Sequence, residues 1–417
     1  MAGVENKKKL RLMYGRAFTS SLSNSMVTPF IYVYAARIGA SPGEIGWMHS
    51  FNNLFVSSLQ VPWGRLSDML GRRVGIIVVT SIAASLTWIP MALTAEPKIF
   101  LALVALYFFL SSAAVPAWNA LLRETTQPSS RSLVVSNMNI ASLLGSLLAT
   151  AFSGWLIDYS GGSLLAPSVI AVSVSLPGSI ILLRIKEGRI RETSFKSIIS
   201  AFRISDIPSL INESVDFKLF LKISALQGFF MSYAWPLFTI TTATILNLSM
   251  TEVGAISVIQ TIATLIAQPL MGRLATLKGK KRLMVIYYVS LTAVPLAYCF
   301  AQSFLHLAIL SVYLGVMLAA GNATILPYIL DIIPEDRVGE LTSIYNMITG
   351  ISHFMGSAVG GNMDELMSLY FGRRASLQTG YFFSAAGRLA SGFFFLKINE
   401  KPSTRRTDKQ SSLHDRP

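Results

Sequence analysis

Long stretches without charged residues alternate with short charged segments along this chain. The stretches cover residues 17–36, 45–64, 74–95, 99–122, 132–157, 159–183, 223–251, 253–272, 283–330, 341–363 and 375–396, the last interrupted by Arg388. About 20 predominantly apolar residues form a helix that crosses a bilayer. The stretch 283–330 is long enough for two crossings, with Gln302, Ser303 and His306 marking the turn. The pattern predicts an all-α integral membrane protein with twelve transmembrane helices.

The composition supports this prediction. The chain has 417 residues, of which 52% are hydrophobic and only 13% are charged. An ordinary soluble domain carries roughly a quarter charged residues. A soluble globular protein is therefore excluded.

The formal charge of +14 first raises the question of nucleic-acid binding. If the amino terminus is inside, only Arg37, Lys98, Arg373 and Arg374 of the 35 basic residues lie outside, and Arg388 lies within a span. Short loops rich in Lys and Arg stay cytoplasmic. We therefore expect a multi-pass cell-membrane protein with both termini in the cytoplasm, bound to lipid and to no nucleic acid.

The two halves of the sequence repeat at a shift of 208 residues. The residues Glu44, Gly46, Gln60, Gly64, Arg65, Leu66 and Gly71 recur as Glu252, Gly254, Gln268, Gly272, Arg273, Leu274 and Gly279. Such repetition is typical of transporters built from two similar bundles. We predict a six-helix bundle over 1–185, a cytoplasmic linker over 186–222, a second six-helix bundle over 223–398, and a cytoplasmic tail over 399–417.

Two acidic residues of the repeat have a structural explanation. Glu44 and Glu252 each stand three residues after a serine, Ser41 and Ser249, just before an apolar run. This is the pattern of a capping box at the start of a helix. We therefore expect helix capping here, with ion coupling as the alternative.

The loop between the second and third predicted spans carries the most specific motif. It reads Gly64-Arg65-Leu66-Ser67-Asp68-Met69-Leu70-Gly71-Arg72-Arg73. This segment resembles the loop signature of the major facilitator superfamily. The resemblance extends to Glu124, Pro128 and Arg131 after the fourth span and to Asp331, Pro334, Arg337 and Gly339 after the tenth. It implies two six-helix bundles that move against each other.

The resemblance also implies a conformational latch. Asp68 would lie against the amino-terminal end of the eleventh helix, near Gly339, where the helix dipole favours a carboxylate. It would pair with Arg72 or Arg123 and hold the bundles together when the outer side is open; a solvated loop is the alternative. The residues assigned to this latch motif are Gly64, Arg65, Asp68, Gly71, Arg72, Arg73, Arg123 and Arg337.

Two other patterns of the same family are missing. The fifth span has Gly145 and Gly154 without the Gly-Pro core of drug/proton antiporters, and the fourth span has no arginine in its membrane part. The sugar-porter signatures beyond the first loop are not recognisable. These absences count against multidrug exchange without excluding it.

By resemblance, the substrate cavity lies between helices one, four, seven and ten. Polar and aromatic residues recur at helical spacing there. The candidate substrate-binding residues are Asn24, Tyr32, Tyr107, Trp118, Gln227, Trp235, Tyr313 and Asn322. The alternative for each is a helix contact or an interfacial aromatic side chain.

Ionisable groups within the spans are functional candidates because a charge costs about 2.5–3.5 kcal/mol at mid-membrane. The spans hold no carboxylate at that depth. Proton coupling would therefore fall to His49 or His353, since histidine titrates near neutral pH; hydrogen-bonded packing is the alternative. Arg16 and Arg388 could attract an anion, but Arg16 can also snorkel to the surface, and Arg388 can bond to neighbouring carbonyls.

The resulting prediction is a secondary active or facilitative transporter that moves a small organic solute by alternating access. An efflux carrier and a metabolite or organic-anion carrier both remain open, as does coupling to protons or another ion. The chain lacks a nucleotide-binding Gly-Lys-Ser/Thr loop and enzyme motifs such as His-Glu-x-x-His. We expect no enzyme activity, no cofactor, no metal and a monomer. The alternative is a non-transporting membrane sensor or scaffold with the same fold.

Overall fold

The computed structural model describes residues 2–127, 131–185, 211, 214–334 and 337–399, except for the side chains of residues 2–8, 61, 68 and 132. Within these ranges the chain is helical and contains no strand. Most of the expected linker 186–222 and nearly all of the expected tail 399–417 lie outside the described residues. Helix α12 begins at Val215, within the range expected for the linker.

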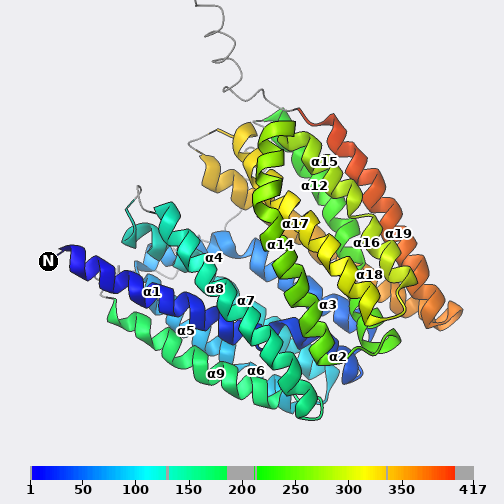
Figure 1. Cartoon of the computed structure of the whole chain (residues 1–417), viewed down its shortest axis with the longest axis horizontal. Helices are drawn as coiled ribbons and strands as arrows, with labels where there is room; N and C mark the ends of the chain where they lie inside the picture. The colour runs from blue at the N-terminus through cyan, green and yellow to red at the C-terminus, as the bar shows by residue number, and fades with distance from the viewer. Residues whose placement is uncertain (1, 128–130, 186–210, 212–213, 335–336, 400–417) are drawn as a thin grey trace, which may run out of the picture.

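The helices form two bundles (Figure 1). The first contains α1 (Ala2–Ser25), η1 (Thr28–Phe30), α2 (Ile31–Arg37), α3 (Pro42–Asn53), η2 (Leu54–Ser58), α4 (Gln60–Leu70), α5 (Arg73–Leu86), α6 (Trp88–Leu93), α7 (Pro97–Thr125), α8 (Arg131–Tyr159), α9 (Leu165–Ile180) and η3 (Ile181–Arg184). The second contains α12 (Val215–Tyr233), α13 (Trp235–Ile240), η4 (Thr241–Ile245), α14 (Met250–Lys278), α15 (Lys280–Ser290), α16 (Ala293–Phe300), α17 (Phe304–Ile332), α18 (Val338–Phe371), α19 (Arg373–Phe394) and η6 (Phe395–Lys397).

Seven of the described helical segments are long and apolar enough to cross a membrane by themselves. They are Arg73–Leu93, Pro97–Thr125, Leu133–Tyr159, Leu165–Arg184, Met250–Lys278, Lys280–Phe300 and Phe304–Ile332. The other predicted spans correspond to α1–α2, α3–α4, α12–α13, α18 and α19, which are more polar or interrupted. The arrangement is consistent with the twelve predicted crossings.

Proline interrupts the first rod of each bundle. Pro29 stands in the first turn of η1, between α1 and α2, and Pro236 stands in the first turn of α13. Proline lacks the N–H that an unbroken helix would use. Both rods therefore change direction, immediately before Tyr32 in one and beside Trp235 in the other.

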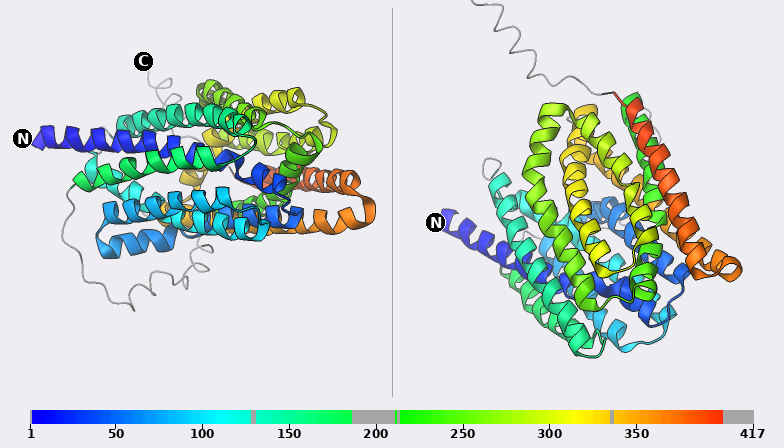
Figure 2. Two further views of the ribbon diagram at one scale, coloured as in Figure 1. Left: turned by 90° about the horizontal axis from the view of Figure 1, so that it is seen from below. Right: turned by 45° about the vertical axis from the view of Figure 1, so that its right-hand side comes forward.

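The bundles meet at one end, called here the closed end, which carries residues 37–42, 158–160, 247–251 and 362–372. In Figure 1, α8 and α14 lie together near this end and separate towards their other ends, and Figure 2 shows the same spread from two further directions. The hydrogen bonds described between the bundles use Arg37, Ser41, Gly43, His49, Ser50, Ser58 and Asp158 of the first bundle. The structure is thus a V: α3 and η2 stay in contact with α18 from the closed end as far as Ser58 and Met347, whereas α8 and α14 separate away from the closed end.

Two close glycine crossings join the bundles. A Cβ atom added to Gly46 of α3 would lie 3.0 Å from the Cα atom of Gly361 of α18. A Cβ added to Gly154 of α8 would lie 2.6 Å from the carbonyl oxygen of Met250 at the start of α14. Helices approach this closely only where side chains are absent or small. Gly46 and Gly254 are equivalent residues of the 208-residue repeat. Gly46 lies in the α3–α18 crossing, and Gly254 of α14 lies against Thr150 of α8 in the other crossing.

Candidate functional site

Four ring side chains form a column across the boundary between the bundles. Tyr32 of α2 stacks on His49 of α3, with ring centroids 3.7 Å apart and planes 15° apart. His49 lies 6.2 Å from Trp235 of α13, and Trp235 lies 5.1 Å from His353 of α18, again between centroids. The structure therefore brings together two proposed binding residues and both proposed coupling residues. We call these four residues the aromatic column.

Neutral polar groups complete the column. The Asn52 side-chain amide donates to the hydroxyl of Tyr32 at 2.9 Å. His49 Nε2 lies 3.2 Å from the hydroxyl of Thr239, which belongs to the other bundle. The site offers rings for stacking and hydroxyl, amide and imidazole groups for hydrogen bonds. Rings together with a few neutral polar groups are the kind of lining that sites for organic molecules use.

A second group of candidates lines a pocket within the first bundle. The pocket has a volume of about 240 Å³ and is lined by Arg16, Ala17, Ser20, Ser21, Asn24, Ile77, Ser81, Ala84, Ser111, Ala114, Val115, Trp118, Ser142 and Ser175. It contains the predicted residues Asn24 and Trp118, and the hydroxyl of Tyr107 lies 3.5 Å from the Asn24 side-chain oxygen. We call this group the serine pocket.

Arg16 does not snorkel to the surface, so that part of the sequence interpretation is wrong. Only 6% of the residue is exposed, and its Nη2 donates to the hydroxyl of Ser81 at 2.8 Å. Ser81 lies on α5, across the bundle from α1. The guanidinium is held inward by this contact and lines the serine pocket.

Three predicted binding residues contact their own bundle instead. Gln227 is 1% exposed, and its side-chain oxygen accepts a hydrogen bond from Ser391. The hydroxyl of Tyr313 donates to the carbonyl oxygen of Ser290 at 2.7 Å. The side-chain amide nitrogen of Asn322 lies 3.5 Å from the side-chain oxygen of Gln268 on α14. Helical spacing identified the polar stripes, but Gln227 and Tyr313 make contacts within their own bundle. Asn322 is exposed, and its role in binding stays a prediction.

Arg388 also has a structural role. It is 2% exposed and donates to the carbonyl oxygens of Leu291 and Met231 at 3.1 and 2.8 Å, and to the hydroxyl of Ser384 at 3.1 Å. These acceptors come from three helical rods of the second bundle. The guanidinium therefore ties that bundle together and is not directed at a substrate.

The latch motif turns at a glycine and joins two helices of the first bundle. Gly71 ends α4 in the left-handed region, with φ of 64°, which glycine adopts without strain. Arg73 pairs with Glu124 at the end of α7, with 3.2 Å between Nε and Oε1, and also donates to Ser67 at 2.8 Å. The motif thus joins the end of α4 to the end of α7 within one bundle.

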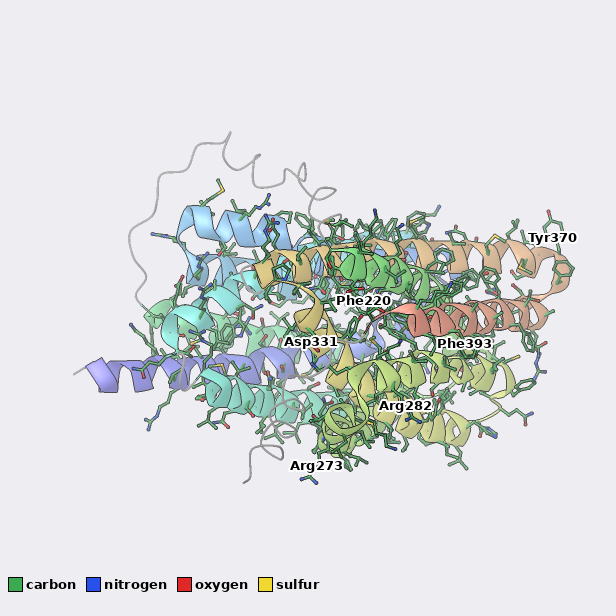
Figure 3. The ribbon with its side chains drawn as sticks, turned by 90° about the horizontal axis from the view of Figure 1, so that it is seen from above. Phe220, Arg273, Arg282, Asp331, Tyr370 and Phe393 are labelled. Carbon is green, nitrogen blue, oxygen red and sulfur yellow. The ribbon has the colours of Figure 1, made fainter. Side chains whose placement is uncertain are left out.

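The second copy makes an equivalent pair. The Lys280 amine lies 2.5 Å from an Asp331 oxygen at the end of α17. Figure 3 shows Asp331 at the end of its bundle opposite to Tyr370, away from the closed end. In each repeat, the acidic residue at the end of the fourth or tenth rod therefore pairs with a basic residue of the loop motif.

The remaining latch residues take no part in these two pairs. Arg65, Arg72 and Arg123 are exposed, and Arg337 Nε lies 3.8 Å from Glu340 on the first turn of α18. Gly64 lies next to Pro116 of α7. The side chain of Asp68 lies outside the described residues. The proposed contact between Asp68 and α18 stays a prediction.

Carboxylates that the sequence interpretation missed bind helix starts across the closed end. Asp158 of α8 accepts hydrogen bonds from the backbone N–H groups of Met250 and Thr251 at 2.9 and 2.7 Å, and from the Thr251 hydroxyl at 2.6 Å. Glu365 of α18 accepts from the Ser41 hydroxyl at 2.7 Å and from the Gly43 N–H at 3.0 Å. Each bundle therefore caps a helix of the other.

The predicted capping boxes are confirmed at the same two helix starts. Ser41 and Glu44 cap α3, and Ser249 and Glu252 cap α14, each with both reciprocal hydrogen bonds. The 208-residue repeat could have indicated the inter-bundle carboxylates as well, because Asp158 aligns with a position adjacent to Glu365. The repeat analysis considered only the segment around the loop motif.

Known proteins resemble this chain over nearly its whole length. The family model described as Major Facilitator Superfamily matches residues 15–210 and again residues 220–415. The chain belongs to this superfamily. The double match confirms the family predicted from the loop motif, the two repeated halves and the all-α membrane fold. This major facilitator is a secondary transporter of small solutes.

Relatives and solved structures show which carriers this major facilitator is similar to. The multidrug resistance protein MdtG of Dickeya zeae is 24% identical over 90% of this chain and 91% of its own length. A homolog of the multi-drug resistance efflux pump PmrA from Lactococcus lactis is 26% identical over 86% and 88%. The fold of nucleoside transporter NupG matches with a TM-score of 0.73 at 14% identity, over 94% of this chain and 98% of NupG. A D-xylose-proton symporter matches with a TM-score of 0.66 at 13% identity, over 95% and 98%.

Proposed function

We propose that this major facilitator is an efflux carrier for small amphipathic organic solutes, located in the cell membrane with both termini in the cytoplasm. The aromatic column carries the proposal, because it places stacking rings from both bundles at their boundary. The efflux direction is supported by the name of the Lactococcus lactis relative, a homolog of an efflux pump. The chain lacks the Gly-Pro core and the fourth-span arginine of drug/proton antiporters. Their absence counts against membership of that antiporter group, not against efflux by another mechanism.

With cytoplasmic termini, the closed end is the outer face. The V then opens inward, so the structure corresponds to the state that takes up cargo from the cytoplasm. Cargo would bind against the aromatic column and leave once the bundles rock apart at the closed end. Of the column's side chains, the histidines His49 and His353 have the ordinary pKa values nearest to neutral, and they are the groups through which a proton gradient would act.

The test measures efflux of the dye Hoechst 33342 from cells that express the chain. Trp235→Ala should lower the efflux rate by roughly 2- to 12-fold, since an aromatic pair contributes about 0.5–1.5 kcal/mol beyond burial. Trp235→Phe should retain most of the rate. Trp155→Ala is the matched control, because Trp155 is 50% exposed on the outside of α8 and stacks on Tyr159.

Equal rates for Trp235→Ala and Trp155→Ala would contradict a role of the column in binding. A folded chain that moves neither this dye nor other amphipathic solutes would instead indicate a non-transporting scaffold. Collapsing the proton gradient in the same assay distinguishes two mechanisms. Efflux that stops indicates a proton-coupled carrier, and efflux that continues indicates a facilitative one.

A further inference from the structure

The serine pocket holds a buried cation with incomplete hydrogen bonding. Arg16 is 6% exposed, and its Nε is buried without a hydrogen-bond partner. Among the residues that the structure describes, no carboxylate forms an ion pair with Arg16. A buried, unpaired charge is costly, so it persists where it has a function. The guanidinium therefore has a donor without an acceptor, and the residue lines a pocket that has room for a ligand.

The rest of the pocket fits one kind of ligand. The pocket hydroxyls that can donate a hydrogen bond to a ligand are those of Ser20, Ser21, Ser81 and Ser175. Ser111 and Ser142 line the pocket as well, but their hydroxyls donate to backbone carbonyl oxygens. Guanidinium groups bind planar oxyanions in a bidentate geometry, with two parallel N–H···O hydrogen bonds. Val115 and Trp118 add an apolar wall, and Val115 is 41% exposed, so the wall reaches the surface of the bundle.

We propose that the serine pocket is an oxyanion subsite, in which Arg16 and the surrounding hydroxyls bind the carboxylate of a small organic acid whose apolar body contacts Val115 and Trp118. The volume of about 240 Å³ suits a single ring with one acidic group. The proposal rests on the proposed carrier function only for the statement that this acid is cargo; binding itself is independent of that function.

The test compares benzoate with benzamide, which has the same ring and nearly the same shape but no charge. The full chain is purified in detergent, and its melting temperature is measured at constant ionic strength with increasing amounts of each compound. A ligand that prefers the folded state raises the melting temperature. Benzoate should raise it by about 2 °C or more, while benzamide leaves it unchanged.

Three variants assign the effect to the pocket. Arg16→Gln should abolish the response to benzoate. Arg16→Lys should retain part of it, because lysine keeps the positive charge but cannot make the bidentate contact. Ala114→Leu fills the pocket without altering any charge and should also abolish the response. Arg11→Gln is the matched control, since it removes an exposed positive charge from the same helix and should respond as the wild type does.

Equal shifts with benzoate and benzamide, or no shift with either, would overturn the subsite. A full benzoate response in Arg16→Gln would overturn it as well. If Arg16→Gln does not fold, the wild-type comparison and Ala114→Leu still decide. Dye efflux without selective benzoate binding would refute the subsite alone, whereas selective binding without any efflux would refute the carrier function alone.

Discussion

The contact of Asp158 with the start of α14 predicts how firmly the closed end is held. The carboxylate accepts three hydrogen bonds from Met250 and Thr251, at 2.6 to 2.9 Å, across the bundle boundary. Asp158→Asn removes the charge and turns one acceptor oxygen into a donor that faces N–H groups. A charge at a helix start contributes about 0.3–1 kcal/mol when exposed and up to about 2 kcal/mol when partly buried. We expect a loss of about 1–2 kcal/mol, since Asp158 is partly buried.

That loss corresponds to a roughly 5- to 30-fold shift in the equilibrium towards the state in which the closed end is open. Distances between spin labels report the two states. The labels are attached to Lys98→Cys at the start of α7 and Gln302→Cys before α17, exposed positions at the closed end of different bundles, in a Cys299→Ala background. The population at long distance should increase in Asp158→Asn.

Thr251→Val is the control for this experiment, because it removes one donor but leaves both backbone hydrogen bonds and the charge. It should shift the populations less than Asp158→Asn does. An unchanged distance distribution in Asp158→Asn, or an equal shift in the control, would refute the reasoning. Glu365→Gln tests the second inter-bundle cap and should act in the same direction.

Three further predictions concern other parts of the chain. Asp68→Asn should insert normally but slow dye efflux at least several-fold, since the latch would lose its charge; wild-type efflux would remove the latch hypothesis. Arg388→Met should lower the stability by about 2–4 kcal/mol in thermal unfolding because buried carbonyl oxygens lose their donor, and a melting temperature equal to wild type would contradict the bridging role. Gly154→Leu should force the α8–α14 crossing apart and abolish efflux, while Gly272→Ala, where an added Cβ meets no atom within 4 Å, should not; efflux at the wild-type rate in Gly154→Leu would show that the crossing tolerates a large side chain.

The fold followed closely from the sequence because membrane helices satisfy their backbone hydrogen bonds internally. A run of apolar residues is sufficient to predict a rod, and the serine and glutamate spacing at residues 41–44 and 249–252 correctly predicted two helix starts. The loop motif and the 208-residue repeat together identified the family. Each of these signals is local or strictly periodic, so it can be recognised without knowing how the rods are packed.

The site depended on tertiary structure. Helical spacing placed Tyr32, Trp235, Gln227 and Tyr313 in equivalent stripes, yet only Tyr32 and Trp235 meet in the aromatic column. The rotation of each rod about its axis and the angle between the bundles decide which stripe faces the boundary. Close packing at glycine crossings such as Gly46 against Gly361 sets both quantities. Contacts between distant residues also determined that Arg16 points inward and that Asp158 caps a helix of the other bundle, because neither partner is near in sequence.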